Sequence, residues 1–364
     1  MVATGTNPRV SVLIDTFNHE RYIEQAIESV LGQTLPRDHM EIIVVDDGST
    51  DRTAEIVRGF EPRLRLIQKK NGGQASAFNI LISQARSDIV AFLDGDDWWA
   101  SGKLSAVLDA FKKNPTIAAV GHGFFEADES SSIAEVFTPQ ENCFLDLSSV
   151  QSAHLADLGR TLLGTSRLAV RRRVLDKIGP LPENLVFCAD TPILTLALAL
   201  GGAIILREPL CYYRIHSQNL FGGNLASERK VRAKAEILGF QLESFPARLR
   251  HLGVSDEVIA SLFESDRIEL ERIKIQLGER GRWETFQTEL RDFRSSYKNP
   301  SLGYRTFRYA VGALTLLLPP RRFYDLRAWY SRHNVRRFRS RFASAEPTVP
   351  DNVFVRRPVP KARP

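Results

Sequence analysis

The first 120 residues alternate short, mainly apolar runs with segments that have a helical repeat. The apolar runs are residues 10–14, 42–45, 64–67, 89–93 and 117–120, which Ser11 and Arg65 interrupt. Between the first two runs, Ile23, Ala26, Ile27 and Val30 recur with the spacing of one helix face. Strands that are apolar on both faces, alternating with helices, are typical of a mainly parallel sheet that helices cover on both sides. The sequence therefore predicts an α/β, Rossmann-like fold.

A polar loop follows each of the first four predicted strands. These loops are residues 15–18, 46–49, 70–74 and 94–97. In an open parallel sheet, ligands bind in the crevice beyond the carboxyl ends of the strands. A single loop of this kind would indicate only a turn. Four of them at one edge of one sheet indicate a binding site.

The last of these loops carries Asp94, Asp96 and Asp97 directly after a buried strand. Three neighbouring carboxylates repel one another, and each is costly to remove from water. A divalent cation with a phosphorylated ligand would offset both effects. A simple polar turn is the alternative, since Asp and Gly are common turn residues. The other three loops favour the ligand.

The composition of the 364-residue chain limits its class and location. The length allows one large α/β domain and a smaller appendage. We find no apolar run of the roughly 20 residues that a membrane-spanning helix needs, and residues 1–6 do not resemble a signal peptide. The three cysteines, Cys143, Cys188 and Cys211, have neither a metal spacing nor a disulfide pattern. We expect a cytoplasmic protein.

Positive charge is concentrated at the C-terminal end. Residues 301–364 carry 14 Lys and Arg against 3 Asp and Glu, whereas residues 1–300 carry 35 against 40. The mildly acidic main part is not suited to nucleic acid. Leucine and aromatic residues among the arginines of residues 301–345 suit a segment on the inner face of an anionic membrane. A helix packed on the catalytic domain, with its arginines solvated, is the alternative.

These patterns predict four parts along the chain. Residues 1–222 would form the ligand-binding α/β domain and residues 223–300 a helical region. Residues 301–345 would form the basic membrane-surface segment. Residues 346–364, rich in Pro and Arg, are expected to be disordered.

An ordered set of motifs over residues 8–220 resembles the inverting family-2 glycosyltransferases of the GT-A fold. The matching stretches are residues 10–14 with Phe17-Asn18, then residues 27–34, 44–51 and 92–97, the last being the DxD motif. The resemblance implies transfer of a sugar from a nucleotide diphosphate sugar, UDP-linked, to a hydroxyl of a glycan or lipid-linked acceptor. It also implies inversion and a bound Mg or Mn ion. Such acceptors belong to polysaccharide and cell-envelope biosynthesis.

The resemblance also implies roles for the strand-end loops. Asp94 would bind the ribose hydroxyls and Asp96 the metal, while Asp97 has no assigned role. Asp47 would accept a hydrogen bond from the imide N–H of the base, unless it only forms an Asp-Gly turn. The remaining nucleotide contacts are expected from Thr16, Phe17, Asn71 and Gly72, with a core role for Phe17 and a plain glycine turn at residues 70–74 as alternatives.

An inverting transfer needs a general base for the acceptor hydroxyl. The family has a Glu-Asp pair at the start of a later helix, and the matching residues here are Ala189 and Asp190. Asp190 is the candidate base, with helix capping as the alternative. His216 resembles the family's Tyr-Arg-x-His segment, which implies contact with the diphosphate or the metal; a structural histidine is the alternative. Asp15, where the family usually has Pro, is a second departure.

Two other functions would use similar residues. A nucleotide-sugar-binding protein without turnover is favoured only by Ala189 in place of Glu. A nucleotidyltransferase would need a basic, Gly-rich triphosphate loop near the N-terminus, and residues 16–20 are not such a loop. We therefore expect a metal-dependent glycosyltransferase.

Overall fold

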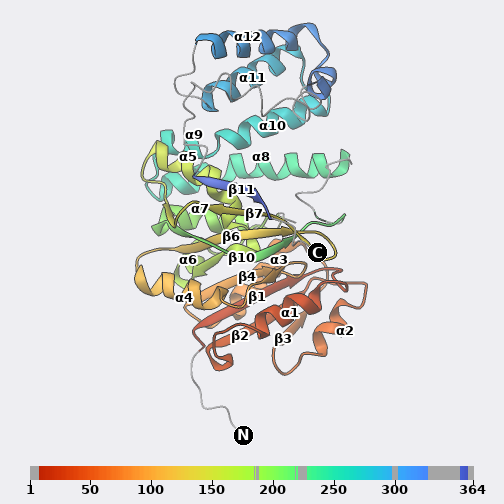
Figure 1. The fold of residues 1–364 in the computed structure, drawn as a ribbon, viewed down its shortest axis with the longest axis vertical. Helices are drawn as coiled ribbons and strands as arrows, with labels where there is room; N and C mark the ends of the chain where they lie inside the picture. The colour runs from red at the N-terminus through yellow and green to blue at the C-terminus, as the bar shows by residue number, and fades with distance from the viewer. Residues whose placement is uncertain are drawn as a thin grey trace. The chain divides into compact units, whose positions relative to one another are not determined.

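The computed structural model describes residues 8–183, 185, 188–217, 219, 228–296, 302–326 and 353–359 (Figure 1). The chain divides into two compact units. The sheet unit comprises Met1–Gly223, Leu252–Val254 and Asn352–Pro364. The helical unit comprises Asn224–His251 and Ser255–Asp351.

The sheet unit contains one mixed sheet, which confirms the α/β class. Its main path runs β11-β7-β6-β9-β4-β1-β2-β3, and β10 pairs with β5, β6 and β8. The strands are β1 (Val10–Thr16), β2 (Met40–Asp46), β3 (Arg65–Gln68), β4 (Ile89–Asp94), β5 (Trp98–Trp99), β6 (Ala119–Ala127), β7 (Ile133–Pro139), β8 (Cys143–Leu145), β9 (Ala169–Arg171), β10 (Ala203–Arg214) and β11 (Phe354–Pro358).

Strands β3, β2, β1 and β4 are parallel, as the sequence predicts. Asp15 at the end of β1 pairs with Asp94 at the end of β4, and Thr16 pairs with Asp46 at the end of β2. The carboxyl ends of these strands, and the loops that follow them, therefore meet at one edge. Beyond β4 the sheet is mixed, because β9 runs antiparallel to both β4 and β6.

Helices of the sheet unit bury the apolar stripes that the sequence predicts. Helix α1 buries Ile23, Ala26, Ile27 and Val30. These apolar positions lie on one face because three- and four-residue spacings match the helical repeat. The helices are α1 (Ile23–Leu31), α2 (Thr53–Arg58), α3 (Gln74–Gln84), α4 (Lys103–Lys113), α5 (Val150–Gly159), α6 (Arg172–Ile178) and α7 (Asp190–Gly201), with short 3₁₀ turns at Arg37–His39, Arg160–Leu163 and Thr165–Arg167.

The end of the chain returns to the sheet unit. Strand β11 (Phe354–Pro358) pairs antiparallel with β7 (Ile133–Pro139), and Arg356 forms ion pairs with Glu126 and Glu135. The disorder expected for residues 346–364 is therefore wrong for β11. Composition alone missed it, because the backbone of Val355 and its neighbours finds partners only at the exposed edge of β7. Residues 346–352 and 360–364 lie outside the described residues.

The helical unit consists of α8 (Glu228–His251), α9 (Asp256–Leu262), α10 (Glu264–Gln276), α11 (Arg282–Ser296) and α12 (Leu302–Leu317). Val231 and Leu238 of α8 pack with Ile273 of α10. Arg272 of α10 bonds to Glu289 and Asp292 of α11. Among the described residues, no helix is long and apolar enough to cross a membrane. Residues 327–345 of the predicted basic segment lie outside the described residues.

Candidate active site

The acidic loop after β4 gathers three carboxylates. Ligand atoms of Asp94, Asp96 and Asp97 lie within 4.8 Å of one another. Gly95 allows this loop to approach β1, because a Cβ there would lie 2.6 Å from Oγ1 of Thr16 and 2.9 Å from Nδ1 of His19. Clustered carboxylate oxygens are the donors that hard divalent cations prefer. The donor set therefore fits Mg²⁺ or Mn²⁺.

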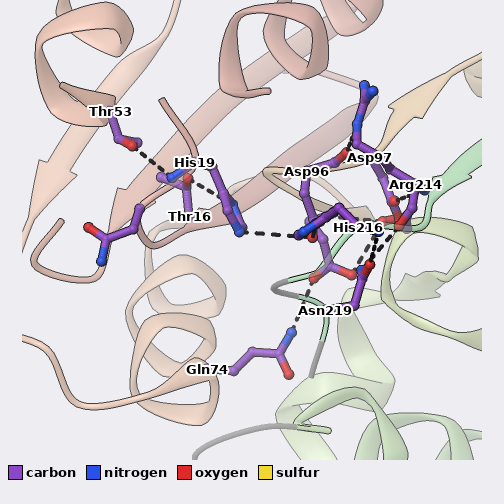
Figure 2. A network of polar contacts seen from close by, with 12 residues as sticks. Thr16, His19, Thr53, Gln74, Asp96, Asp97, Arg214, His216 and Asn219 are labelled. Atoms are coloured by element: carbon purple, nitrogen blue, oxygen red, sulfur yellow. Dashed lines mark hydrogen bonds and ion pairs between the residues drawn. The ribbon is translucent and has the colours of Figure 1, made fainter. Parts of the chain in front are cut away.

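Two histidines flank Asp96. Nε2 of His216 lies 3.0 Å from Oδ2 of Asp96, and Nε2 of His19 lies 3.9 Å from the same oxygen (Figure 2). Burial raises the pKa of Asp96, but His19 and His216 outweigh burial and leave that pKa below its ordinary value. Asp96 is therefore held ionised, as a metal ligand must be.

His19 and Arg214 belong to this site, although no sequence motif pointed to them. Nε of Arg214 donates to the carbonyl of Asp96 at 2.9 Å, and its backbone N–H donates to Oδ1 of Asp97 at 2.9 Å. The guanidinium also lies over the ring of Trp98, 4.4 Å from its centroid. Arg214 lies in the Tyr-Arg-x-His segment, which is the sequence signal that could have indicated it. Arg214 holds the acidic loop against β10.

Asp97 is the most buried carboxylate of the acidic loop. Only 2% of this residue is exposed, and burial together with the negative charge of Asp96 raises its pKa to about 7. Its hydrogen bond from the Arg214 backbone makes it a link between the acidic loop and β10. The sequence assigned no role to Asp97, and the structure shows that it connects the acidic loop to β10.

Asp94 and Asp15 sit side by side at the ends of β4 and β1. Burial and the charges of Asp15 and Asp96 raise the pKa of Asp94 well above its ordinary value. Burial and Asp96 raise the pKa of Asp15 to about 7. Oδ1 of Asp15 has no hydrogen-bond partner within the described part of the chain. At this edge, burial and the neighbouring carboxylates therefore disfavour the ionised forms of Asp15 and Asp94.

Asp47 organises the loop after β3. Nζ of Lys69 lies 2.5 Å from Oδ1 of Asp47, and Gly72 N–H donates to the same oxygen. Gly73 N–H donates to Oδ2 of Asp47. The segment after β2 can approach the loop after β3 closely because residue 48 is glycine. A Cβ at this position would lie 2.7 Å from the backbone nitrogen of Asn71. The positive charge next to Asp47 therefore comes from Lys69, whereas Lys70 is exposed.

Thr16 and Phe17 lie at the end of β1 with different exposure. Thr16 is buried, and its Oγ1 lies 3.3 Å from Nδ1 of His19. Phe17 is 42% exposed, so it does not fill the core. A role for both residues in a base pocket remains a prediction, as do the roles of Asn71 and Gly72.

Asp190 is the first residue of α7 and faces the same site. Its Oδ2 accepts a hydrogen bond from Thr165 N–H at 2.9 Å. Burial raises the pKa of Asp190, which the Thr165 bonds and the guanidinium of Arg167 partly oppose. Asp190 also contributes to the raised pKa of Asp94, so the two carboxyl groups lie near each other. A carboxylate with a raised pKa near a cluster of acidic groups has the properties of a general base.

Known proteins show clear similarity to this chain. The model of glycosyl transferase family 2 matches residues 11–178. An uncharacterized glycosyltransferase of Nostoc sp. strain PCC 7120 is 33% identical over 238 residues, which are 63% of this chain and 72% of that protein. The uncharacterized glycosyltransferase EpsJ of Bacillus subtilis is 31% identical over 221 residues, 58% of this chain and 63% of EpsJ.

Two solved structures share the fold at 18% identity. The mannosyltransferase PcManGT of Pyrobaculum calidifontis, in complex with GDP-Man and Mn²⁺, matches 89% of this chain and 85% of its own, with a TM-score of 0.51. S. aureus TarS 1-349, in complex with UDP-GlcNAc, matches 79% of this chain and 89% of its own, with a TM-score of 0.50. These structures share the fold, while the family match over residues 11–178 and the Nostoc relative, 72% of which is covered at 33% identity, identify the chain as a member of glycosyl transferase family 2.

Proposed function

We propose that this protein transfers a sugar, with inversion, from a nucleotide diphosphate sugar to a hydroxyl of a glycan or lipid-linked acceptor. The observation that carries the proposal is the meeting of the Asp94–Asp97 loop and Asp190 at one edge of the sheet. The loop can hold the ribose and a diphosphate-bound cation, while Asp190 can take a proton. These are the two requirements of a single-displacement transfer.

In this mechanism the oxygen of the acceptor hydroxyl attacks the anomeric carbon, and Asp190 accepts the proton of that hydroxyl. The new glycosidic bond forms on the face opposite the diphosphate, and the bond to the diphosphate oxygen breaks, so the configuration inverts. Asp96, with His216 beside it, would hold Mg²⁺ or Mn²⁺. The bound cation would offset negative charge that develops on the leaving diphosphate.

The nucleotide would occupy the loops after β1, β2 and β3. Oδ2 of Asp47 accepts one hydrogen bond from Gly73 and retains a lone pair for the imide N–H of a base. This supports a uracil nucleotide, and the exposed ring of Phe17 is available to stack on the base. We therefore propose UDP as the nucleotide of the donor.

The proposal is tested by measuring thermal stabilisation with a panel of UDP and GDP sugars, with and without Mg²⁺ or Mn²⁺. A ligand that binds only the folded protein raises its Tm by mass action. Asp190→Asn should retain this stabilisation but lose transfer, while Asp176→Asn on α6, whose side chain is exposed, should retain both. A wild-type protein that binds a donor and never transfers or hydrolyses it would instead support a nucleotide-sugar-binding protein.

We further propose that helix α12 rests on an anionic membrane surface. Leu302 and Leu317 on this helix are 78% and 72% exposed, and residues 302–317 include two arginines but no acid. Nη1 of Arg282 donates to the carbonyl of Leu316 at 3.4 Å, which brings exposed Trp283 to the same end. Aromatic and leucine side chains among arginines suit a membrane interface with anionic headgroups.

This surface is tested by co-sedimentation with vesicles of phosphatidylcholine alone or mixed with phosphatidylglycerol. The wild type should bind the anionic vesicles, and binding should weaken with salt. The double variants Leu316→Ser/Leu317→Ser and Arg321→Glu/Arg322→Glu should each lose binding. Val150→Ser/Leu158→Ser on α5 also changes two exposed apolar residues and should retain binding. Equal sedimentation of all variants would mean that α12 does not contact lipid.

A further inference from the structure

Gln74, the first residue of α3, joins two carboxylate-bearing segments of the site. Its Nε2 donates to Oδ1 of Asp94 at 3.1 Å, and its Oε1 accepts from the backbone N–H of Ala189 at 3.1 Å. Figure 2 shows its amide directed at the acidic loop. One side chain thus connects the predicted ribose ligand to the residue immediately before the proposed base, Asp190.

The two contacts also fix the orientation of the amide. A carboxylate oxygen accepts and a backbone N–H donates, so the NH₂ group must face Asp94 and the oxygen must face Ala189. In a flipped amide, the oxygen of Gln74 would face the carboxylate of Asp94, and its NH₂ group would face the N–H of Ala189. The contact is therefore specific for a side chain that both donates and accepts at this reach.

The rest of α3 holds the same segment. Ala75 N–H donates to the carbonyl of Leu185 at 3.2 Å. Nδ2 of Asn79 donates to the carbonyl of Leu181 at 2.9 Å, and Oδ1 of Asn79 accepts from Leu181 N–H at 2.7 Å. Together with Gln74, the first six residues of the helix make four hydrogen bonds to the backbone that leads into α7.

Helix α3 begins at the end of the loop after β3, which is proposed to bind the nucleotide. Gly73, which precedes Gln74, donates its N–H to Asp47. Helix α3 therefore has the proposed base-recognition loop at its start and the segment before Asp190 along its side. A displacement of Gln74 would therefore shift the positions of Asp47, Asp94 and Asp190.

The segment before Asp190 needs such support. Cys188 has φ of +57°, a left-handed conformation that is uncommon for a residue with a side chain. The next residue is Ala189, whose methyl group cannot form a polar contact of its own. The Gln74–Ala189 hydrogen bond thus restrains the backbone directly after the strained residue and directly before the base.

We propose that Gln74 is a positioning residue that ties the ribose-binding carboxylate to the backbone of the general base. The inference rests on the proposed transfer reaction, in which Asp190 must meet the anomeric carbon of a donor held at Asp94. Gln74 acts through these two residues. It sets their separation without contributing to the binding of the donor itself.

Two substitutions of Gln74 and one control substitution test the two contacts. Gln74→Met keeps the length of the side chain and removes both hydrogen bonds. Gln74→Glu keeps an acceptor for Ala189 N–H but places a carboxylate against Asp94. Gln84→Met makes the same replacement at the exposed last residue of α3 and serves as the control.

We expect Gln74→Met to lower kcat for transfer by about 10- to 100-fold, because small misplacements of reacting groups have effects of this size. Its donor Kd should stay within about threefold of the wild type, since the direct ligands remain. Gln74→Glu should weaken donor binding through repulsion at Asp94. Gln84→Met should change neither quantity.

Amide hydrogen exchange provides a readout that does not depend on turnover. Backbone exchange at Ala189 should be faster in Gln74→Met and close to wild type in Gln74→Glu and Gln84→Met. Unchanged exchange at Ala189 in Gln74→Met would overturn the proposal, as would a donor Kd that weakens as much as kcat/KM. If the wild type transfers no sugar, the proposed reaction fails, while the exchange measurement still decides the role of Gln74.

Discussion

Nε2 of His216 lies 3.0 Å from Oδ2 of Asp96, although 120 residues separate them in the chain. Asp96 follows β4 and His216 follows β10, so the contact forms only when these two strands have taken their places in the sheet. It combines an imidazole with the carboxylate that is expected to hold the metal. The first prediction concerns this pair.

Asp96→Asn should abolish stabilisation by Mn²⁺ in the presence of UDP, because the amide removes the charge that attracts the cation. His216→Ala should weaken Mn²⁺ binding by about 10- to 100-fold, the range found when a residue that supports a metal ligand is removed. Calorimetric titration of Mn²⁺ into the UDP complex measures both effects. His251→Ala, at an exposed position, is the control. Equal affinity in His216→Ala and the control would remove His216 from the metal site.

The guanidinium of Arg167 should keep the acid limb of the pH profile at a lower pH than burial of Asp190 alone would give. It lies 4.5 Å from the ring centroid of Phe124 and opposes the raised pKa of Asp190. Nε and Nη1 of Arg167 have no hydrogen-bond partner among the residues that the structure describes. Arg167→Met therefore removes the charge without breaking a hydrogen bond of Nε or Nη1.

In the wild type, kcat should fall as pH drops through the pKa of Asp190, because protonation removes the base. Burial places this loss above the usual aspartate range. Arg167→Met should shift the acid limb to higher pH, whereas exposed Arg173→Met should leave it in place. Identical profiles for both variants would show that Arg167 does not act on Asp190.

Asp15→Asn should stabilise the metal-free protein at neutral and alkaline pH. Burial and Asp96 raise the pKa of Asp15 to about 7 in the folded protein, against 3.8 for the ordinary group. Below the ordinary value both states are protonated; between the two values the folded protein retains a proton that the unfolded chain loses. Stability is therefore lost as pH rises through this window.

The stabilising effect of Asp15→Asn should accordingly grow from pH 5 to pH 8 and reach about 2–4 °C in Tm for each kcal/mol of ionisation free energy removed. Thermal unfolding in EDTA at several pH values measures it. Asp88→Asn, on the surface before β4, should show no such trend. A stabilisation that does not vary with pH would indicate a cause other than ionisation.

Arg214→Met should strongly destabilise the sheet unit. The buried guanidinium donates to the Asp96 carbonyl and to Ser131, and it lies over the Tyr22 and Trp98 rings. Breaking a buried charged network of this kind costs about 3–5 kcal/mol. Arg214→Lys should recover little, because an ammonium group lacks the planar fork of donors.

Urea denaturation of these variants gives the free energy of unfolding. Arg207→Met on the same strand is exposed and should change that free energy by less than about 0.5 kcal/mol. A similar small change in Arg214→Met would mean that the acidic loop is held by other contacts.

Much of the sheet edge was predictable from local patterns. Mainly apolar runs indicated β1, β2, β3 and β4, and parallel strands necessarily bring their carboxyl ends together. The cluster of Asp94, Asp96 and Asp97 follows from their spacing on one loop. Pro192 and the Gly201-Gly202 pair predict a helix over residues 191–200, and α7 (Asp190–Gly201) lies within one residue of those bounds.

The contacts that complete the site were not predictable in this way. Gln74 and Ala189 are 115 residues apart, and Arg214 and Asp96 are 118 apart. Nothing in the spacing of these residues distinguishes a side chain that reaches the site from one that reaches solvent. The same holds for β11, whose apolar and basic residues become a strand only against β7.

The sequence alone therefore determined the α/β class, the edge of the sheet where the site lies and the acidic loop at its centre. These properties depend on periodicity and on neighbours along the chain. Only the tertiary structure decided that His216 and His19 flank Asp96, that Arg214 holds the loop, and that Gln74 connects Asp94 to the segment of Asp190. Hydrogen bonds and ion pairs act over a few ångströms in space, and distance along the chain does not encode which residues the fold brings that close.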